Sequence, residues 1–310
     1  MAELYAKAIV NPAAGSYSVG RQWQLIKRQL QKTGVSFDHE FTKNTGHALN
    51  IATRAIRDGN QYLIAVGGDG TVNEVANGIL RSANPLSITL GIVSAGTAHA
   101  FAASFDGTKN YNDINSNFFL FGNKRALIDV GMIHCSSHGQ IIERFFLNEA
   151  SIGLAAEIVG SWKPLSTHFG SSVNIALRTV AGYKALAVHR NKNVRLLIGN
   201  QIEQNIICTV VMSNGRYCAD KMLMAPHASL DDGLLDAIIV GDISKFELLK
   251  IRPALYNGNH VKHSKIREIK TTTVSVESDE RMLVEADGDI IGECPATFQV
   301  MLSILNVVVF

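Results

Sequence analysis

A glycine-rich turn at residues 67–71, Gly-Gly-Asp-Gly-Thr, separates two apolar patterns of different period. The apolar run 62–66 before it is typical of a buried strand, and the apolar residues of 72–80 recur at helical spacing. Thr71 and Glu74 form the Thr-x-x-Glu pattern of a capping box, which predicts the helix start. Glycine lets the backbone approach a ligand closely, and a helix start offers free N–H groups that suit a phosphate.

Asp69 is the unusual member of this turn, because a carboxylate repels a phosphate unless a cation lies between them. A Mg²⁺ ion would resolve that conflict. Two common phosphate motifs are excluded. The dinucleotide fingerprint would need glycine at Asn73, and the P-loop pattern that Gly15 and Gly20 begin lacks its lysine. A tight strand-to-helix turn without a ligand is the alternative interpretation.

Strand and helix patterns alternate regularly through the first 97 residues. Strands are expected at 6–10, 35–41, 62–66 and 88–93, and helices at 19–30, 48–56 (with Thr45 as its cap) and 72–80. Such alternation predicts a parallel sheet with right-handed crossovers, whose ligands bind beyond the carboxyl ends of the strands. The turns at 11–15, 42–46, 67–71 and 94–97 all fall at that edge, so a site is predicted there.

The pattern changes after about residue 125, and strands dominate with few helices. Strands are expected at 126–133, 144–152, 194–198, 206–212, 234–240 and 271–276, and helices at 171–189 and 246–255. This half is typical of an antiparallel sandwich. The helix 171–189 carries Val173, Leu177, Val180 and Ala181 and is followed by His189, Arg190, Lys192 and Arg195. A core-facing helix with a basic end is favoured over a basic, membrane-facing edge.

Two groups of carboxylates stand out in this half. Residues 229–235 place Asp231 and Asp232 before a glycine, which suits either a turn or a site for a hard cation. Residues 285–289 contain Asp-Gly, a hairpin signal, between acidic neighbours. If two domains close over a nucleotide, a carboxylate from this turn could take the proton of an attacking hydroxyl. The histidine pairs 134/138 and 260/263 lack a ligand set, so no metal is expected at them.

Composition narrows the class of protein. The net charge of +2 argues against a nucleic-acid binder driven by overall charge. The four cysteines are widely scattered and show no zinc spacing, which fits a reducing cytoplasm. No signal peptide is expected at the start, and the apolar stretch 300–310 is too short to span a bilayer and is expected to be a strand. A homodimer is the expectation from base rates alone.

Taken in order, the motifs resemble the diacylglycerol kinase catalytic-domain superfamily, specifically soluble bacterial lipid kinases related to diacylglycerol and sphingosine kinases. They are Asn11-Pro12 with Gly15; Gly67-Gly68-Asp69-Gly70-Thr71 with Asn73 and Glu74; Gly96-Thr97; Asn148 with Gly153; 213–217; Ala225-Pro226; 230–236; and Asp287-Gly288-Asp289 with Pro295. The resemblance implies a doubly wound α/β nucleotide domain, residues 1–125, and an antiparallel β-sandwich lipid domain, residues 126–310, with the site in the cleft between them. The C-terminal strand is expected to pack back on the first domain.

The resemblance also implies roles for individual residues. Contacts to ATP would come from Asn11, Gly15, Thr42, Gly67, Gly68, Asp69, Gly70, Thr71, Asn73, Glu74 and Thr97. Asp69 would act through the catalytic Mg²⁺. Asp232, with the carbonyls of Ser229 and Leu234, is similar to the family's structural Mg²⁺ site. Asp289 stands where the family has its general base.

Three departures from the family pattern bear on activity. The base is usually Glu, and Asp289 is shorter by about 1.5 Å, a difference large enough to cost about a hundredfold in rate if nothing compensates. His99 and Ala100 replace Asn and Asp of the bacterial diacylglycerol kinases, although sphingosine kinases also carry Ala at the second place. Ser16 stands where a basic residue often follows, with Arg21 the nearest substitute.

The leading hypothesis is a cytoplasmic, peripherally membrane-associated kinase. It would use ATP and Mg²⁺ to phosphorylate a hydroxyl of a diacylglycerol-like or sphingoid-like lipid at the membrane surface, with no nucleic-acid partner. One alternative is a nucleotide-binding regulatory protein with little or no kinase activity, which the three departures motivate. Another is a kinase for a soluble alcohol such as NAD, against which the segments 231–236 and 287–289 argue.

Overall fold

The computed structural model describes residues 5–94, 100–105, 124–166, 171–218 and 222–309. The chain divides into two compact units. The first contains residues 1–129 and 302–310, and the second contains residues 130–301. Each unit has its own sheet region and buried residues.

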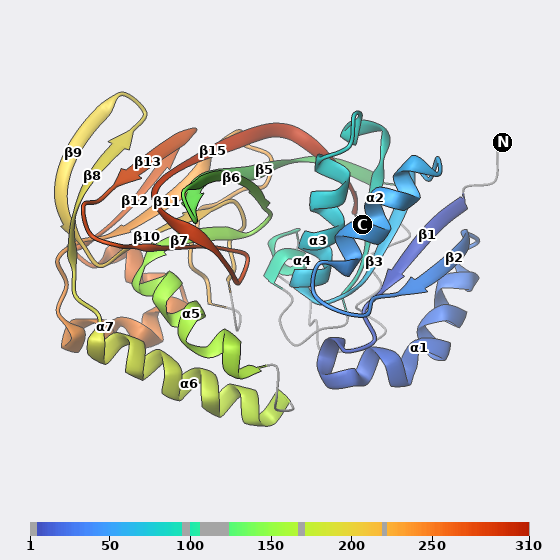
Figure 1. The fold of residues 1–310 in the computed structure, drawn as a ribbon, viewed down its shortest axis with the longest axis horizontal. Helices are drawn as coiled ribbons and strands as arrows, with labels where there is room; N and C mark the ends of the chain where they lie inside the picture. The colour runs from blue at the N-terminus through green and yellow to red at the C-terminus, as the bar shows by residue number, and fades with distance from the viewer. Residues whose placement is uncertain (1–4, 95–99, 106–123, 167–170, 219–221, 310) are drawn as a thin grey trace. The chain divides into compact units, whose positions relative to one another are not determined.

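The first unit is built on a parallel sheet (Figure 1). Its strands β1 (Tyr5–Val10), β2 (Ser36–Phe41), β3 (Tyr62–Gly67) and β4 (Thr89–Ser94) run in the order β4-β3-β1-β2. The end of β15 (Asp289–Val309) adds beside β4 in parallel, with Asn306 opposite Thr89. All residues of β3 and β4 are buried, as expected for a parallel strand covered on both faces. The predicted α/β class and parallel sheet are confirmed.

Four helices of the first unit connect or follow these strands: α1 (Ala14–Lys32), α2 (His47–Arg57), α3 (Asp69–Leu80) and α4 (Ala100–Phe105), with a short 3₁₀ turn η1 (Pro85–Ser87) before β4. The predicted apolar stripe of α1 is buried, from Val19 to Leu30. Two predicted caps are wrong. Gly46, not Thr45, is the N-cap of α2, and Gly68 is the N-cap of α3 without any side-chain cap. The Glu74 carboxylate is used elsewhere, so no capping box forms.

The second unit consists of antiparallel strands. They are β5 (Lys124–Ser137, which begins in the first unit), β6 (Gln140–Phe146), β7 (Glu149–Gly153), β8 (Lys192–Ile198), β9 (Gln201–Ile207), β10 (Thr209–Ser213), β11 (Leu235–Val240), β12 (Ile266–Thr271), β13 (Thr273–Glu277), β14 (Leu283–Ala286) and the first part of β15. The predicted strands 144–152 and 206–212 are each two strands. They break at bends at 147–148 and at Cys208, whose residues are buried, so continuous burial concealed both breaks.

Helices cover part of this unit: α5 (Leu154–Ser166), α6 (Ser171–Val188) and α7 (Lys245–Ile251), followed by the 3₁₀ turns η3 (Arg252–Tyr256) and η4 (Asn259–Lys262). Helix α5 was not predicted, and it packs against α6. The expected helix at 246–255 ends earlier, where Pro253 follows. Val180 was predicted on the core face of its helix, but it is exposed, while Ala181 is buried.

The strands β10 and β11 of the second unit are buried on both faces, whereas β8 and β9 each have exposed residues. In β10, Val210 and Met212 belong to the core between the strands, whereas Val211 belongs to a second cluster with Leu154 of α5. This two-sided burial agrees with the predicted sandwich. Within the described ranges, no helix is long and apolar enough to cross a membrane.

Candidate functional site

The glycine-rich turn after β3 is packed around Thr71. The Thr71 side chain is buried, and its hydroxyl accepts a hydrogen bond from Nδ2 of Asn11 at 3.0 Å. A Cβ atom on Gly67 would lie 2.5 Å from Oγ1 of Thr71, so only glycine fits there. At Gly70 an added Cβ would meet nothing within 4 Å. Packing therefore explains Gly67, whereas the backbone at Gly70 is open to a ligand.

The loop after β1 lies beside this turn. The N–H of Asn11 donates to the carbonyl of Val66 at 2.9 Å, so the ends of β1 and β3 are joined. Gly15, Ser16 and Tyr17 then adopt positive φ angles of 58°, 56° and 66°. Two of these residues carry a side chain, and each such conformation costs about 1–3 kcal/mol. Stored strain of this kind is typical of ligand-binding loops. Arg21 donates to the carbonyl of Ser16 at 3.2 Å.

The carboxylate of Asp69 connects the turn to α4. Its Oδ2 accepts the N–H of Ala100 at 3.2 Å, and its Oδ1 accepts the N–H of Phe101 at 3.3 Å. Charge-assisted bonds of this type hold the start of α4 against the start of α3. The predicted contact Thr97 and the substituted His99 lie outside the described residues.

The other predicted nucleotide contacts have structural partners of their own. The Glu74 carboxylate accepts the N–H groups of Gly46 at 2.8 Å and Ala48 at 3.0 Å, so it caps α2 from a distance in sequence. The buried side chain of Asn73 accepts a hydrogen bond from Asn77 at 3.2 Å. Thr42 follows β2, and its N–H donates to Val10 at 2.8 Å. Glu74 and Asn73 therefore stabilise helices, and Thr42 joins the ends of β1 and β2.

A second group of candidates lies in the hairpin between β14 and β15. Asp287 and Gly288 have φ angles of 45° and 86°, and Ala286 pairs with Asp289, as in a two-residue hairpin turn. The Asp287 carboxylate accepts the N–H groups of residues 147, 148 and 149 at 2.6, 2.9 and 3.1 Å. This fixes the hairpin to the turn between β6 and β7.

Asp289 is the first residue of β15, and its side chain is 34% exposed. Its Oδ2 lies 3.5 Å from Nη2 of Arg144 in β6, which is a long contact. A nearby guanidinium favours the ionised carboxylate. Asp289 is therefore an accessible, charge-assisted carboxylate on a rigid hairpin. Arg144 was not among the predicted site residues.

Sequence reasoning also missed a pair of acids behind the hairpin. Glu285 is buried, accepts the Ser151 hydroxyl at 2.7 Å and accepts the N–H of Gly288. Burial raises the pKa of Glu149 well above its usual range, and the neighbouring carboxylates of Glu285 and Asp287 raise it further. The acidic group 285–289 was the signal for Glu285, whereas Glu149 is brought beside it only by the pairing of β7 with β14.

The loop 229–234 shows a carboxylate that is already neutralised. Asp232 accepts the N–H of Leu234 at 3.1 Å through Oδ1 and lies 2.7 Å from Nζ of Lys270 through Oδ2. The same ammonium lies 3.2 Å from the buried Asp236. The Ser229 hydroxyl donates to Asp231 at 2.6 Å. Across the described ranges, no three His, Cys, Asp or Glu side chains gather as a metal-binding group.

The basic residues 189–195 do not form one surface. Lys192 binds the carbonyl of Arg281 at 2.7 Å, and Arg195 pairs with Glu277 at 3.0 Å. His189 is buried, with Nδ1 at 2.7 Å from Glu157. Arg190 follows the end of α6 and is exposed. Among the described residues, it is the one member of this basic group that forms no ion pair.

Two protein families match this chain. The family described as "Diacylglycerol kinase catalytic domain" matches residues 5–133, and "YegS C-terminal NAD kinase beta sandwich-like domain" matches residues 170–309. These two matches, to different parts of the chain, support the diacylglycerol kinase catalytic-domain superfamily. The two matched ranges cover most of both units.

Curated relatives agree with this assignment, and solved structures share the fold. The chain is 27% identical over 293 residues to a diacylglycerol kinase of Staphylococcus carnosus, which covers 94% of this chain and 91% of the relative. It is 28% identical to that of Staphylococcus saprophyticus, with the same coverage. A crystal structure of a diacylglycerol kinase from Bacillus anthracis matches with a TM-score of 0.72 and 19% identity over 100% of this chain and 98% of that one. Yeast NADH kinase in complex with NADH matches with a TM-score of 0.52 and 8% identity over 98% and 82%. These structural likenesses show a shared fold.

Proposed function

We propose that this kinase transfers the γ-phosphate of ATP to the hydroxyl of a lipid, either diacylglycerol-like or sphingoid-base-like. The observation that carries the proposal is the difference between the carboxylates of Asp287 and Asp289 in hydrogen bonding and exposure. Asp287 is saturated by three backbone N–H groups, whereas Asp289 is accessible and beside a guanidinium. An accessible carboxylate such as that of Asp289 can accept the proton of the lipid hydroxyl that receives the phosphate.

The nucleotide is proposed to lie against the turn 67–71 and the loop 11–15. The open backbone at Gly70 and the N-terminal end of α3 suit phosphate oxygens. The side chains of Thr71, Asn73 and Glu74 are engaged in the fold, so their contribution is to hold the backbone in place. Thr42, which begins the loop after β2, and Gly15, in the loop after β1, complete the proposed set.

The fit of Mg²⁺ differs between the two expected sites. At Asp69 the carboxylate oxygens are hard anionic donors that two backbone N–H groups hold in place, so they suit a magnesium ion, which would neutralise phosphate charge when bound. At the loop 229–234 the ammonium of Lys270 already neutralises Asp232, so that donor set does not fit a divalent cation. No step of the reaction is assigned to that loop.

In the proposed reaction, Asp289 accepts the proton of the lipid hydroxyl. The oxygen of that hydroxyl bonds to the γ-phosphorus while the bond between the γ-phosphorus and the leaving ADP breaks. Arg144 lies 3.5 Å from the Asp289 carboxylate and is proposed to restrain its orientation. The acceptor sits in a bilayer, so the enzyme is proposed to work at the cytoplasmic surface of a membrane. Because the side chain of Asp289 is shorter than that of glutamate, the lipid hydroxyl has to approach it more closely.

The test is transfer of radiolabelled γ-phosphate from Mg·ATP to a lipid extract, with NADH as a second acceptor. We expect a labelled lipid that disappears with Asp289→Asn and with Asp69→Asn. Asp279→Asn, an exposed carboxylate outside the site, is the matched control and should retain full activity. Labelled NADH without labelled lipid would instead establish a soluble-alcohol kinase. Tight ATP binding without any product would establish a nucleotide-binding protein.

A further inference from the structure

Six large apolar side chains are exposed on two adjacent helical segments of the second unit. They are Val180, Tyr183 and Val188 of α6, Phe246 and Leu249 of α7, and Tyr256 of η3. Val188 is 70% exposed and Phe246 is 66% exposed. We call this the α6–α7 face. Exposed apolar groups that gather in one place mark an interaction surface more often than single ones do.

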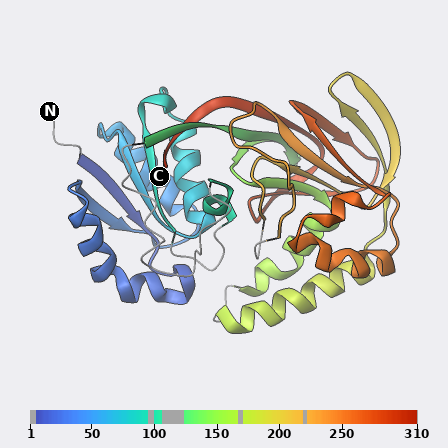
Figure 2. The same ribbon diagram turned by 180° about the vertical axis from the view of Figure 1, so that it is seen from behind.

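The face is continuous across the two helices. On α6 the exposed residues 180, 183, 184, 187 and 188 follow helical spacing, while Ala181 and Ala185 are buried behind them. Lys245 at the start of α7 donates to the carbonyl of Ala187, and Arg252 donates to the hydroxyl of Tyr183 at 3.1 Å. Figures 1 and 2 show α6 and α7 side by side from opposite directions.

Basic side chains are interspersed among these apolar ones. Residues 179–190 and 244–256 contain five Lys and Arg and a single acid, Glu247, which is engaged by Ser244 and Lys265. The Lys250 ammonium lies 4.4 Å from the ring centre of Phe246. Aromatic rings beside long cationic side chains are typical of surfaces that lie at the boundary between lipid headgroups and acyl chains.

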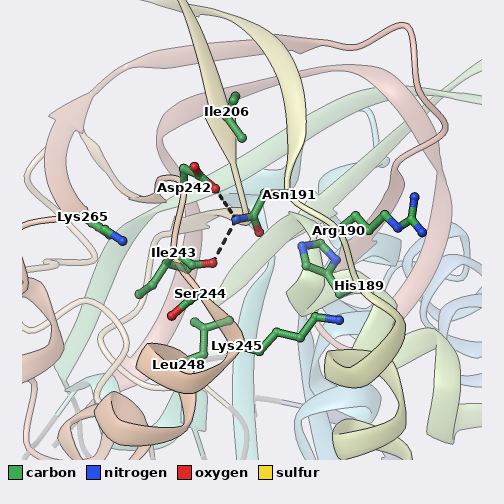
Figure 3. Close-up of a pocket in the computed structure, with 10 residues that line it drawn as sticks. All are labelled: His189, Arg190, Asn191, Ile206, Asp242, Ile243, Ser244, Lys245, Leu248 and Lys265. Atoms are coloured by element: carbon green, nitrogen blue, oxygen red, sulfur yellow. Dashed lines mark hydrogen bonds between the residues drawn. The ribbon is translucent and has the colours of Figure 1, made fainter.

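A pocket of about 580 Å³ opens at the end of α6 and the start of α7 (Figure 3). Three of its lining residues, Arg190, Lys245 and Lys265, are cationic, and His189 lies among them. The one lining carboxylate, Asp242, accepts a hydrogen bond from Asn191 at 2.7 Å. Lys265 also pairs with Glu247 at 3.0 Å, so Arg190 and Lys245 against Asp242 leave the pocket a small excess of positive charge, which suits a phosphate group.

We propose that the α6–α7 face docks on an anionic lipid bilayer and that a headgroup phosphate enters this pocket. The proposal rests on the proposed function, since a lipid acceptor has to be reached at a membrane. Charge complementarity identifies the partner. The surplus of cations excludes a purely apolar occupant, and the exposed Val, Leu, Phe and Tyr give an apolar contribution that a free anion would not use.

The test is sedimentation of the intact protein with vesicles, without ATP and without any acceptor lipid. Vesicles of phosphatidylcholine with phosphatidylglycerol should bind the protein, and phosphatidylcholine alone should bind it weakly. Raising the salt from about 0.1 M to about 1 M shortens the Debye length from about 10 Å to about 3 Å and should release it. Inorganic phosphate at millimolar concentration should not compete, because it lacks the apolar contribution.

Variants separate the two contributions. Phe246→Ser with Leu249→Ser should lower binding by about tenfold. Lys184→Gln with Lys250→Gln should lower binding by roughly fivefold for each charge removed. Arg190→Gln with Lys265→Gln tests the pocket in the same way. Matched controls are Ile141→Ser with Ile202→Ser, exposed apolar residues of β6 and β9, and Arg28→Gln with Lys32→Gln on α1. These should bind as the parent does.

Each result has a single meaning. Loss of binding in the controls to the same degree as in the α6–α7 variants would overturn the proposed face, as would equal binding to neutral vesicles. Competition by inorganic phosphate alone would make the pocket an anion site without a membrane role and would also overturn the proposal. Kinase activity on a short-chain, water-soluble diacylglycerol is measured separately. Activity without vesicle binding would overturn the proposed α6–α7 face and leave the proposed kinase function standing. Vesicle binding without activity would overturn the proposed function.

Discussion

The ammonium of Lys270 lies 2.7 Å from Oδ2 of Asp232 and is shared with Asp236, which is buried. Lys270 and Asp236 are opposite each other on β12 and β11, so the register of two strands brings the cation to the loop 229–234. An internal cation thus holds this loop closed. Burial raises the pKa of Asp236, and Lys270 opposes that rise.

Lys270→Met should destabilise the protein by about 2–4 kcal/mol at pH 8, because it leaves a buried carboxylate without its partner. Removal of Lys270 raises the pKa of Asp236 further, and protonation then relieves the penalty, so the loss should be smaller at pH 5. Urea unfolding at both values measures this. The parent protein should be indifferent to EDTA. A strong stabilisation of the parent by Mg²⁺ without nucleotide would contradict the role given to Lys270.

Gly67→Ala should lower the stability of the protein, whereas Gly70→Ala should lower its affinity for ATP. The first places a Cβ atom 2.5 Å from Oγ1 of Thr71 and should cost about 1–3 kcal/mol of stability. The second has open space in a helix, so stability should be unchanged or higher by up to about 1 kcal/mol. If phosphates lie there, its ATP affinity should fall by about tenfold, or about 1.4 kcal/mol, in a calorimetric titration. Unchanged affinity would move the nucleotide away from this turn.

Asp289→Asn should lower kcat by about 10²–10⁴, the usual contribution of a general base, with little change in KM for ATP. Asp289→Glu restores the missing methylene and should keep or raise kcat. The pH–rate profile supplies the discriminating measurement. Its acidic limb should be lost in Asp289→Asn and kept in Asp289→Glu. If both variants are equally inactive, Asp289 has a structural role instead.

Glu149→Gln should stabilise the protein at pH 7. Because the pKa of Glu149 is raised in the folded state, the folded protein keeps a proton that the unfolded chain releases. Stability therefore falls as pH rises from about 4.3, the unfolded pKa, to the higher folded value. Glutamine lacks this titration, so the difference between variant and parent should shrink toward pH 4. A constant difference across pH would show that Glu149 is ionised throughout.

Glu74→Ala should cost about 1–2 kcal/mol, because the N–H groups of Gly46 and Ala48 lose their acceptor. Glu74→Gln keeps one acceptor oxygen and should cost about half as much. Glu40→Gln, which breaks the surface pair of Arg54 on the same α2, is the control and should cost no more than about 1 kcal/mol. Equal losses in all three would mean that only general electrostatics is involved.

The sequence predicted what depends on local pattern. The strands 62–66 and 88–93 were correctly placed because unbroken apolar runs between turns have few alternatives, and Asp287-Gly288 formed the hairpin that its turn chemistry requires. Helix α5 was missed because its apolar residues directly follow the strand that ends at Gly153. One continuous apolar stretch hid the change of period.

Contacts between distant residues could not be predicted in the same way. Glu74 caps α2 across a gap of 28 residues, and it does so instead of the local capping box that its spacing suggests. Tertiary structure here overrides a local signal that involves the same carboxylate. Lys270 is 38 residues from Asp232, and only the pairing of β11 with β12 brings them together. Residue types were informative, but their partners depended on strand register.

The last part of β15 affects how the first unit folds during synthesis of the chain. Residues 302–309 complete the first unit, and Asn306 pairs with Thr89 of β4. They leave the ribosome about 170 residues after Asp129. At ordinary rates of translation, β4 is an unpaired edge for roughly 10–35 seconds while the whole second unit is synthesised. An open strand edge invites pairing with other chains. The nascent protein should therefore depend on chaperones most strongly in that interval, and less once residue 309 has emerged.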